Sequence, residues 1–159
     1  VLDDEYYKRI EAIQFTMSHD DGKKNEDLQM ADIILLGVSR TSKTPTSIYL
    51  ANRGYKTLNI PLVLEQKIPT ALETQNKNLC VIGLFADPER LSEIRKTRAN
   101  TNQSIDLKTY TDVEKIKIEV EKSKKMFTKF SWPSIDVTRR SVEETAASII
   151  KIFEIKKRK

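Results

Sequence analysis

Short apolar runs alternate with helix-like segments along most of the chain. The runs have the length of strands, and their nearly uniform apolar composition is typical of strands buried on both faces of a parallel sheet. The predicted strands are residues 31–37, 57–63 (interrupted by Pro61), 79–85 and 134–137. Apolar positions at helical spacing predict helices over residues 4–18, 45–52, 112–130 and 141–153. This alternation predicts the α/β fold class, with a parallel sheet flanked by helices on both faces.

Several helix boundaries have sequence signals of their own. Asp87 followed by Pro88 is typical of an N-cap and a first helical residue, so a further helix is expected to begin there. Ser141 and Glu144 have the spacing of a capping box before the last helix. The first helix is expected to be amphipathic, with its apolar face formed by Tyr6, Ile10, Ile13 and Met17.

The most informative stretch follows the first predicted strand. Gly37, Lys43 and Thr44 match the Walker A pattern Gly-x-x-x-x-Gly-Lys-[Ser/Thr], with Ser42 in place of the second glycine. Such a loop presents backbone N–H groups to a phosphate at a helix N-terminus, while the lysine reaches the terminal phosphates and the hydroxyl ligates Mg²⁺. Pro45 suits the start of the following helix because no hydrogen bond is lost there.

An ordinary polar turn is the alternative interpretation of this loop. The apolar strand before it and the helix after it favour the phosphate-binding interpretation, and with it a kinase-like P-loop NTPase core. The missing second glycine requires α-region dihedral angles at Ser42. The predicted nucleotide-binding residues are Gly37, Val38, Ser39, Arg40, Thr41, Ser42, Lys43 and Thr44.

Composition narrows the class of partner. The chain has 159 residues and a formal net charge of +5, but its last four residues are all basic, and without them it has 24 basic and 23 acidic residues. A basic tail is not the charged face that a nucleic-acid-binding domain presents, so we predict no nucleic-acid partner. No apolar stretch is long enough to cross a membrane. One cysteine, Cys80, fits a reducing compartment, so we predict a cytoplasmic protein.

Nearly the whole chain, from about Tyr6 onward, resembles the pyruvate, phosphate dikinase regulatory protein family. A related branch, which acts on phosphoenolpyruvate synthase, shares the fold of this family. Ser42 favours the dikinase branch, because the synthase branch typically has glycine there. Members carry an additional N-terminal domain, so we expect residues 1–30 to form a helical linker from a missing domain and residues 31–159 to form the P-loop nucleotide-binding domain. The segments that carry the resemblance are residues 31–54, 59–63, 83–84, 87–91, 132–133 and 135–147.

The resemblance implies two opposed reactions on a threonine near the catalytic histidine of the dikinase. ADP donates a phosphoryl group to this threonine and inactivates the dikinase, whereas inorganic phosphate removes the group, releases pyrophosphate and restores activity. It implies ADP, inorganic phosphate or pyrophosphate and Mg²⁺ as small-molecule partners, the dikinase as protein substrate, and leaves a homodimer open. Two alternatives remain: an ATP-dependent small-molecule P-loop kinase, and an inactive nucleotide-binding fragment.

Site roles follow from the motif and from this resemblance. Lys43 is predicted to contact the transferred or β-phosphate and Thr44 to ligate Mg²⁺, while Arg40 either touches phosphate or is solvated. A polar stretch after the first helix offers a general base or a water-mediated Mg²⁺ ligand; the alternative is a turn that ends at Gly22. The candidate catalytic residues in that stretch are His19, Asp20 and Asp21.

Arginines near the predicted strand ends are candidate anion ligands. Arg139 and Arg140 follow the fourth strand, where ligand crevices of parallel sheets open. Asp87 follows the third strand as a Walker B carboxylate would, but we favour the helix cap for it. The arginines of the helix that begins there either contribute to an anion-binding lid or, as we favour, lie on a solvated face: Arg90, Arg95 and Arg98.

Overall fold

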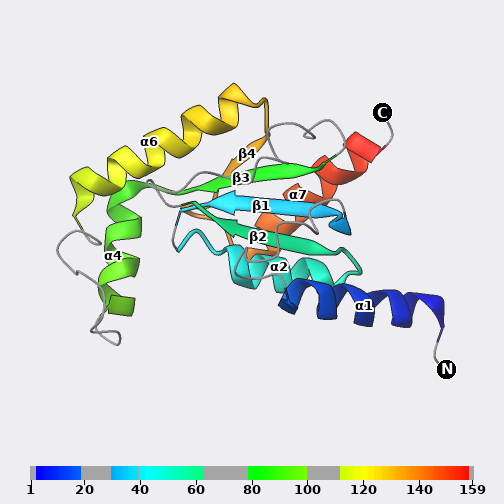
Figure 1. The fold of residues 1–159 in the computed structure, drawn as a ribbon. Helices are drawn as coiled ribbons and strands as arrows, with labels where there is room; N and C mark the ends of the chain where they lie inside the picture. Colours follow the sequence, from blue (N-terminus) through cyan, green and yellow to red (C-terminus); the bar gives the residue numbers. More distant parts are fainter. Residues whose placement is uncertain (1–2, 19–29, 39, 63–78, 100–111, 158–159) are drawn as a thin grey trace.

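Four parallel strands form one sheet in the order β2-β1-β3-β4 (Figure 1). The structure, a computed structural model, describes residues 3–18, 30–38, 40–62, 79–99 and 112–157. The strands are β1 (Ile33–Gly37), β2 (Thr57–Pro61), β3 (Val81–Phe85) and β4 (Ser134–Asp136). The predicted α/β class is confirmed. Pro61 ends β2 rather than interrupting it, because an edge strand tolerates a residue without an N–H group at its end.

The register of the strands brings three loops to one edge of the sheet. Leu36 of β1 is level with Gly83 of β3, and Phe85 of β3 is level with Asp136 of β4. The strands are parallel, so the segments that leave β1, β3 and β4 all emerge at the carboxyl edge. The connection from β1 leads to β2 on one side, whereas β3 and β4 lie on the other side. Such a reversal of strand order is where parallel sheets bind ligands.

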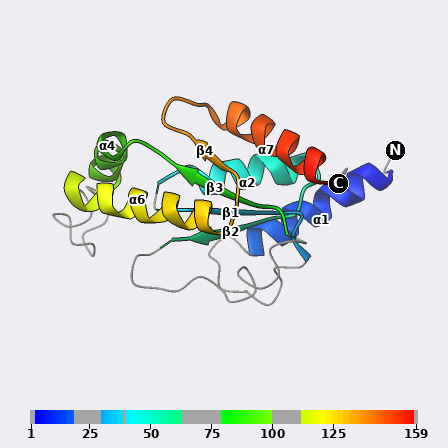
Figure 2. The same ribbon diagram turned by 90° about the horizontal axis from the view of Figure 1, so that it is seen from above.

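Helices cover both faces of the sheet (Figure 2). Helices α2 and α7 lie on one face and α6 on the other, while α4 lies beyond the carboxyl edge and α1 beside β2 and α2 (Figures 1 and 2). The alternating side chains of the strands therefore form two apolar clusters, one centred on Leu35 and Ile82 and one on Leu36 and Phe127. The helices are α1 (Asp4–Ser18), α2 (Lys43–Asn52), α4 (Pro88–Ala99), α6 (Val113–Lys129) and α7 (Val142–Lys157).

The predicted caps are present at two helices. Asp87 Oδ2 accepts a hydrogen bond from the Arg90 backbone N–H at 3.2 Å, so Asp87 is the cap of α4. Ser141 Oγ accepts from the Glu144 backbone N–H at 3.1 Å and donates to Glu144 Oε1 at 3.2 Å. Helix α7 continues to Lys157, beyond the predicted end. Within the described residues, no helix has both the length and the apolar character that crossing a membrane would require.

The prediction for the apolar face of α1 was wrong. Tyr6 and Met17 are 41% and 70% exposed, and the buried residues are Ala12 and Thr16. Thr16 Oγ1 accepts the backbone N–H of Thr57 in β2 at 3.1 Å. Two small side chains four residues apart let α1 approach the edge of β2 closely, which the large apolar side chains would prevent. Helix α1 thus packs by the buried Ala12 and Thr16 together with the half-buried Phe15, and not by the predicted face.

Candidate phosphate-binding site

The segment after β1 turns so tightly that Gly37 has no room for a side chain. A Cβ atom at Gly37 would lie 2.6 Å from Thr41 Oγ1 and 2.8 Å from the Leu84 carbonyl oxygen. Thr41 is fully buried, and its hydroxyl donates to the Val38 carbonyl at 2.9 Å. In the β1–α2 loop, which joins Gly37 to Lys43, the described residues therefore close upon themselves against the end of β3.

Lys43 lies back over this loop. Its Nζ donates to the Val38 carbonyl at 2.8 Å and to Thr41 Oγ1 at 3.3 Å, and the residue is 9% exposed. Lys43 is also the first residue of α2, so the ammonium group and the positive end of the helix dipole lie at the same place. Both favour an anion bound in the β1–α2 loop.

The conformation expected at Ser42 was wrong. Ser42 is left-handed, with φ 62° and ψ 28°, and Arg40 also has a positive φ of 70°. The position where the phosphate-binding pattern has glycine thus keeps the backbone conformation that glycine adopts most readily. Helix α2 begins at Lys43, so Pro45 is its third residue rather than its first. Its missing N–H still costs nothing, because the first four N–H groups of a helix have no intrahelical acceptor.

Glycine at position 42 should therefore stabilise the protein. A left-handed non-glycine residue costs about 1–2 kcal/mol, and the Ser42 side chain makes no capping hydrogen bond that would be lost. We expect Ser42→Gly to raise the free energy of unfolding by roughly 0.5–1 kcal/mol, since glycine also gains entropy in the unfolded chain. Urea denaturation measures this. Ser131 is also exposed and left-handed, with φ 58°, so Ser131→Gly is the matched control at a left-handed position outside the β1–α2 loop. A loss of stability in the first variant alone would contradict this account.

A buried polar relay connects the first turn of α2 to the sheet. Asn59 of β2 donates through Nδ2 to Ser47 Oγ at 3.2 Å, and the Ser47 hydroxyl donates to the Thr44 carbonyl at 2.8 Å. Asn59 and Ser47 are both buried, so the relay fixes the helix start against β2. Thr44 itself is exposed on that turn. A hydroxyl in this place fits one ligand position of a Mg²⁺ ion whose remaining ligands are phosphate oxygens and water.

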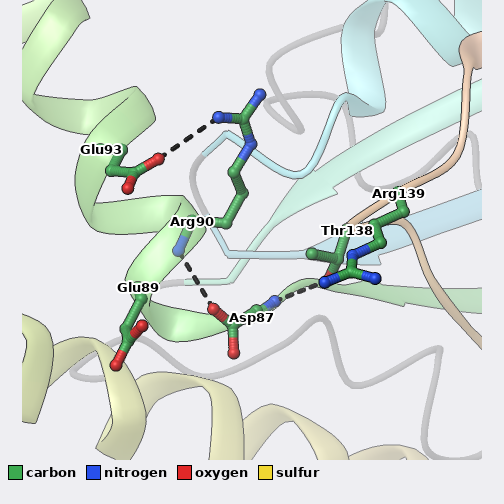
Figure 3. A pocket seen from close by; sticks show the side chains of 6 residues that line it. All are labelled: Asp87, Glu89, Arg90, Glu93, Thr138 and Arg139. Atoms are coloured by element: carbon green, nitrogen blue, oxygen red, sulfur yellow. Dashed lines mark hydrogen bonds and ion pairs between the residues drawn. The ribbon is translucent and has the colours of Figure 1, made fainter.

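A hollow of about 390 Å³ opens at the carboxyl ends of β3 and β4 (Figure 3). Its two walls are joined by a hydrogen bond of 2.8 Å from the Asp87 backbone N–H to Thr138 Oγ1. The Thr138 backbone N–H in turn donates to Asp136 Oδ1 at 3.0 Å. In Figure 3, Thr138 and Arg139 face the start of α4. The residues that line the hollow are Asp87, Glu89, Arg90, Glu93, Thr138 and Arg139.

The candidate arginines occupy different environments. Arg139 is exposed and lines the hollow, whereas Arg140 donates through Nη1 to Ser148 Oγ on α7 at 2.9 Å. Arg90 lines the hollow and pairs with Glu93 at 3.3 Å. The solvated-face prediction was wrong for Arg95, which is 1% exposed and paired with Glu119 of α6.

The family model for kinase/pyrophosphorylase matches residues 1–150. The chain belongs to the kinase/pyrophosphorylase family. The resemblance found in the sequence is thereby confirmed.

Curated relatives of this kinase/pyrophosphorylase chain carry one shared name, that of a candidate pyruvate, phosphate dikinase regulatory protein. The relative from Pelagibacter ubique is 64% identical over 156 residues, 98% of this chain and 57% of the relative. Those from Erythrobacter litoralis and Bartonella bacilliformis are 52% and 50% identical, over 95% and 96% of this chain and 54% of each relative. The chain thus spans about half the length of the relatives that it matches.

The described part of the kinase/pyrophosphorylase chain contains most of the predicted site. The nucleotide-binding candidates from Gly37 to Thr44, except Ser39, form one loop and helix start. Ser39 and the three candidates for catalysis lie outside the described residues: His19, Asp20 and Asp21. Within the described residues, no group of three or more His, Cys, Asp or Glu side chains is arranged to hold a metal ion.

Sequence reasoning did not find two buried polar features near this site. The relay through Asn59 has a weak signal, a lone amide inside an apolar run, whereas the pair of Arg95 with Glu119 has none because its partners lie on separate helices. Cys80, by contrast, behaves as its apolar surroundings predict. Burial raises the pKa of the Cys80 thiol to about 11, so the thiol is protonated at neutral pH and is a poor nucleophile.

Proposed function

We propose that this chain is the nucleotide-binding part of a bifunctional regulator of pyruvate, phosphate dikinase. Family membership and the shared name of the relatives support this function. The regulator transfers a phosphoryl group from ADP to a threonine of the dikinase and inactivates it. With inorganic phosphate it removes that group as pyrophosphate and restores activity. We also propose a cytoplasmic location, in line with the buried free thiol of Cys80.

The observation that carries the proposal is the position of Lys43 over the β1–α2 loop. Phosphoryl transfer requires chiefly that phosphate oxygens are held in place and that their charge is neutralised. The Lys43 ammonium group, 2.8 Å from the Val38 carbonyl, provides a positive charge at the start of α2. When ADP is bound there, we expect Lys43 to exchange its bond to Val38 for one to a β-phosphate oxygen.

Both reactions are phosphoryl transfers, and neither needs an oxidant or a reductant. In the phosphorylation, the threonine oxygen attacks the β-phosphorus of ADP, the bond between this phosphorus and the bridging oxygen breaks, AMP leaves, and the hydroxyl proton passes to a base. We propose that the base is one of His19, Asp20 and Asp21. In the dephosphorylation, an oxygen of hydrogen phosphate attacks the phosphothreonine phosphorus, and the bond between this phosphorus and the threonine oxygen breaks. The proton of the hydrogen phosphate passes to the departing threonine oxygen, and pyrophosphate is released.

Thr44 is the proposed protein ligand of Mg²⁺, which when bound would neutralise charge on the phosphate oxygens. Thr44→Val removes the hydroxyl at nearly constant volume. We expect it to weaken ADP binding in the presence of Mg²⁺ by roughly tenfold, because the ion loses one protein ligand, and to leave metal-free binding unchanged. Calorimetry with and without Mg²⁺ measures both affinities. Equal losses in the two titrations would contradict the assignment.

A comparison of nucleotides tests the proposed function as a whole. The chain and the full-length Pelagibacter relative are each incubated with purified dikinase and either ADP or ATP. ADP-dependent transfer to a dikinase threonine, reversed by inorganic phosphate with release of pyrophosphate, is the expected result. Transfer from ATP to a small molecule would instead indicate a metabolite kinase. Activity of the relative without activity of the chain would indicate that this half needs the remainder of the protein for transfer.

A further inference from the structure

The hollow beside α4 is separate from the nucleotide loop but opens at the same edge of the sheet. Val38 follows β1 directly, Asp87 follows β3 by two residues, and Thr138 follows β4 by two residues. Strands β1 and β3 are neighbours, and the order of the sheet reverses between them. A group held in the hollow therefore lies across the switch point from a phosphate held by the β1–α2 loop.

The charges that line the hollow differ in how far they are already neutralised. The Arg90 guanidinium is paired with Glu93 at 3.3 Å, and Asp87 Oδ2 accepts the Arg90 backbone N–H at 3.2 Å. In the part of the chain that the structure describes, no hydrogen bond or ion pair reaches the Arg139 guanidinium, and Glu89 likewise has no ion-pair partner there. The Arg139 guanidinium on one wall of the hollow and the Glu89 carboxylate on the opposite wall are thus available to bind a ligand.

This pairing of opposite charges selects the kind of ligand. A bare phosphate ion would be attracted by Arg139 but repelled by Glu89 and Asp87. A peptide segment that carries a phosphoryl group has both characters, because its phosphate accepts hydrogen bonds while its backbone N–H groups and neighbouring side chains donate them. The guanidinium binds phosphate with two parallel hydrogen bonds, which also fixes the direction of the group.

We propose that the hollow is the binding site for the acceptor segment of the protein substrate. The phosphothreonine phosphate binds to the Arg139 guanidinium, and hydrogen-bond donors of the segment bind to the Glu89 carboxylate. The inference rests on the proposed function, and it adds the place where the second reactant binds. Arg139 is then a substrate-binding residue and Arg140, bonded to Ser148 of α7, is not.

Adjacent arginines give a matched pair of variants for the test. In the full-length Pelagibacter relative with the equivalent substitutions, and in this chain if it is active alone, Arg139→Gln should raise the KM for phosphorylated dikinase by about 10–100-fold, the value of a charged hydrogen bond to phosphate. The KM for inorganic phosphate and the affinity for ADP should not change. Arg140→Gln, which removes the same charge and the same side-chain volume as Arg139→Gln, should change neither of the two KM values nor the affinity for ADP.

A third variant distinguishes the peptide from free phosphate. Glu89→Gln should raise the KM for phosphorylated dikinase if the hollow holds the peptide segment, and should lower the KM for inorganic phosphate if it holds the free ion. The proposal is overturned if Arg139→Gln changes the KM for inorganic phosphate alone, lowers ADP affinity as much, or behaves like Arg140→Gln. If the unchanged proteins catalyse neither reaction, the proposed function fails, and this site with it.

Discussion

Replacing Lys43 with alanine should lower the rate of ADP-dependent phosphoryl transfer by about 10²–10³-fold, the usual cost of removing one charge-stabilising group from a phosphoryl or acyl transfer site. The ammonium group lies over the β1–α2 loop, 2.8 Å from the Val38 carbonyl, at the start of α2. ADP affinity should fall as well, which calorimetry measures directly.

The same substitution should leave the fold intact. Thr41 Oγ1 continues to donate to the Val38 carbonyl at 2.9 Å when Lys43 is gone, so the carbonyl keeps a partner and the loop keeps its closure. Lys56, which pairs with Glu11 at 2.7 Å beside α1, gives the control variant Lys56→Ala. Both variants should melt close to the unchanged protein, and the control should keep full activity. Unchanged ADP affinity in Lys43→Ala would refute the phosphate-binding assignment.

The sheet could be predicted because its signals are local. Residues 33–36 are all apolar and all buried, as a parallel strand covered on both faces requires. The caps at Asp87 and Ser141 are likewise decided by side chains within three residues of the backbone groups that they bind. The loop at Gly37 was recognisable because only glycine fits at this position: a Cβ atom there would overlap Thr41 and Leu84.

The errors at α1 and at Arg95 have a different cause, which is that tertiary contacts decided the outcome. Tyr6 and Met17 have helical spacing, but the neighbour of α1 is the edge of β2, which accepts Ala12 and Thr16 instead. The charge of Arg95 predicted solvent exposure, and only its position opposite Glu119 on another helix allows it to be buried. The hollow could not be predicted as such, because it depends on how two loops from separate strands are joined at Thr138.

The pair of Arg95 with Glu119 gives the largest expected effect on stability. Arg95 Nη1 lies 2.8 Å from Glu119 Oε2, and the arginine is 1% exposed. Glu119→Ala should lower the free energy of unfolding by about 3 kcal/mol, because it leaves a buried charge without this carboxylate. We take the lower end of the usual 3–5 kcal/mol range, since the Glu119 side chain is 28% exposed and water reaches it.

Urea denaturation with a control on the same helix checks this value. Glu114 pairs with Lys117 at 3.4 Å in an exposed position of α6, so Glu114→Ala should cost less than about 1 kcal/mol. The double variant Arg95→Met with Glu119→Leu should recover most of the loss, because a buried pair replaced by apolar side chains leaves no unpaired charge. A cost for Glu119→Ala no larger than that of the control would show that the pair behaves as a surface pair.

The same variants connect stability to the substrate site. Helix α4 carries Arg90 and Glu93 of the hollow, and the buried pair joins it to α6 through Arg95, two residues beyond Glu93. Loosening α4 should therefore raise the KM for phosphorylated dikinase in Glu119→Ala, while ADP binding at the β1–α2 loop is unaffected. The double variant, which restores the packing without the charges, should restore this KM. If stability returns and the KM does not, Arg95 contributes its charge to the hollow as well as its packing.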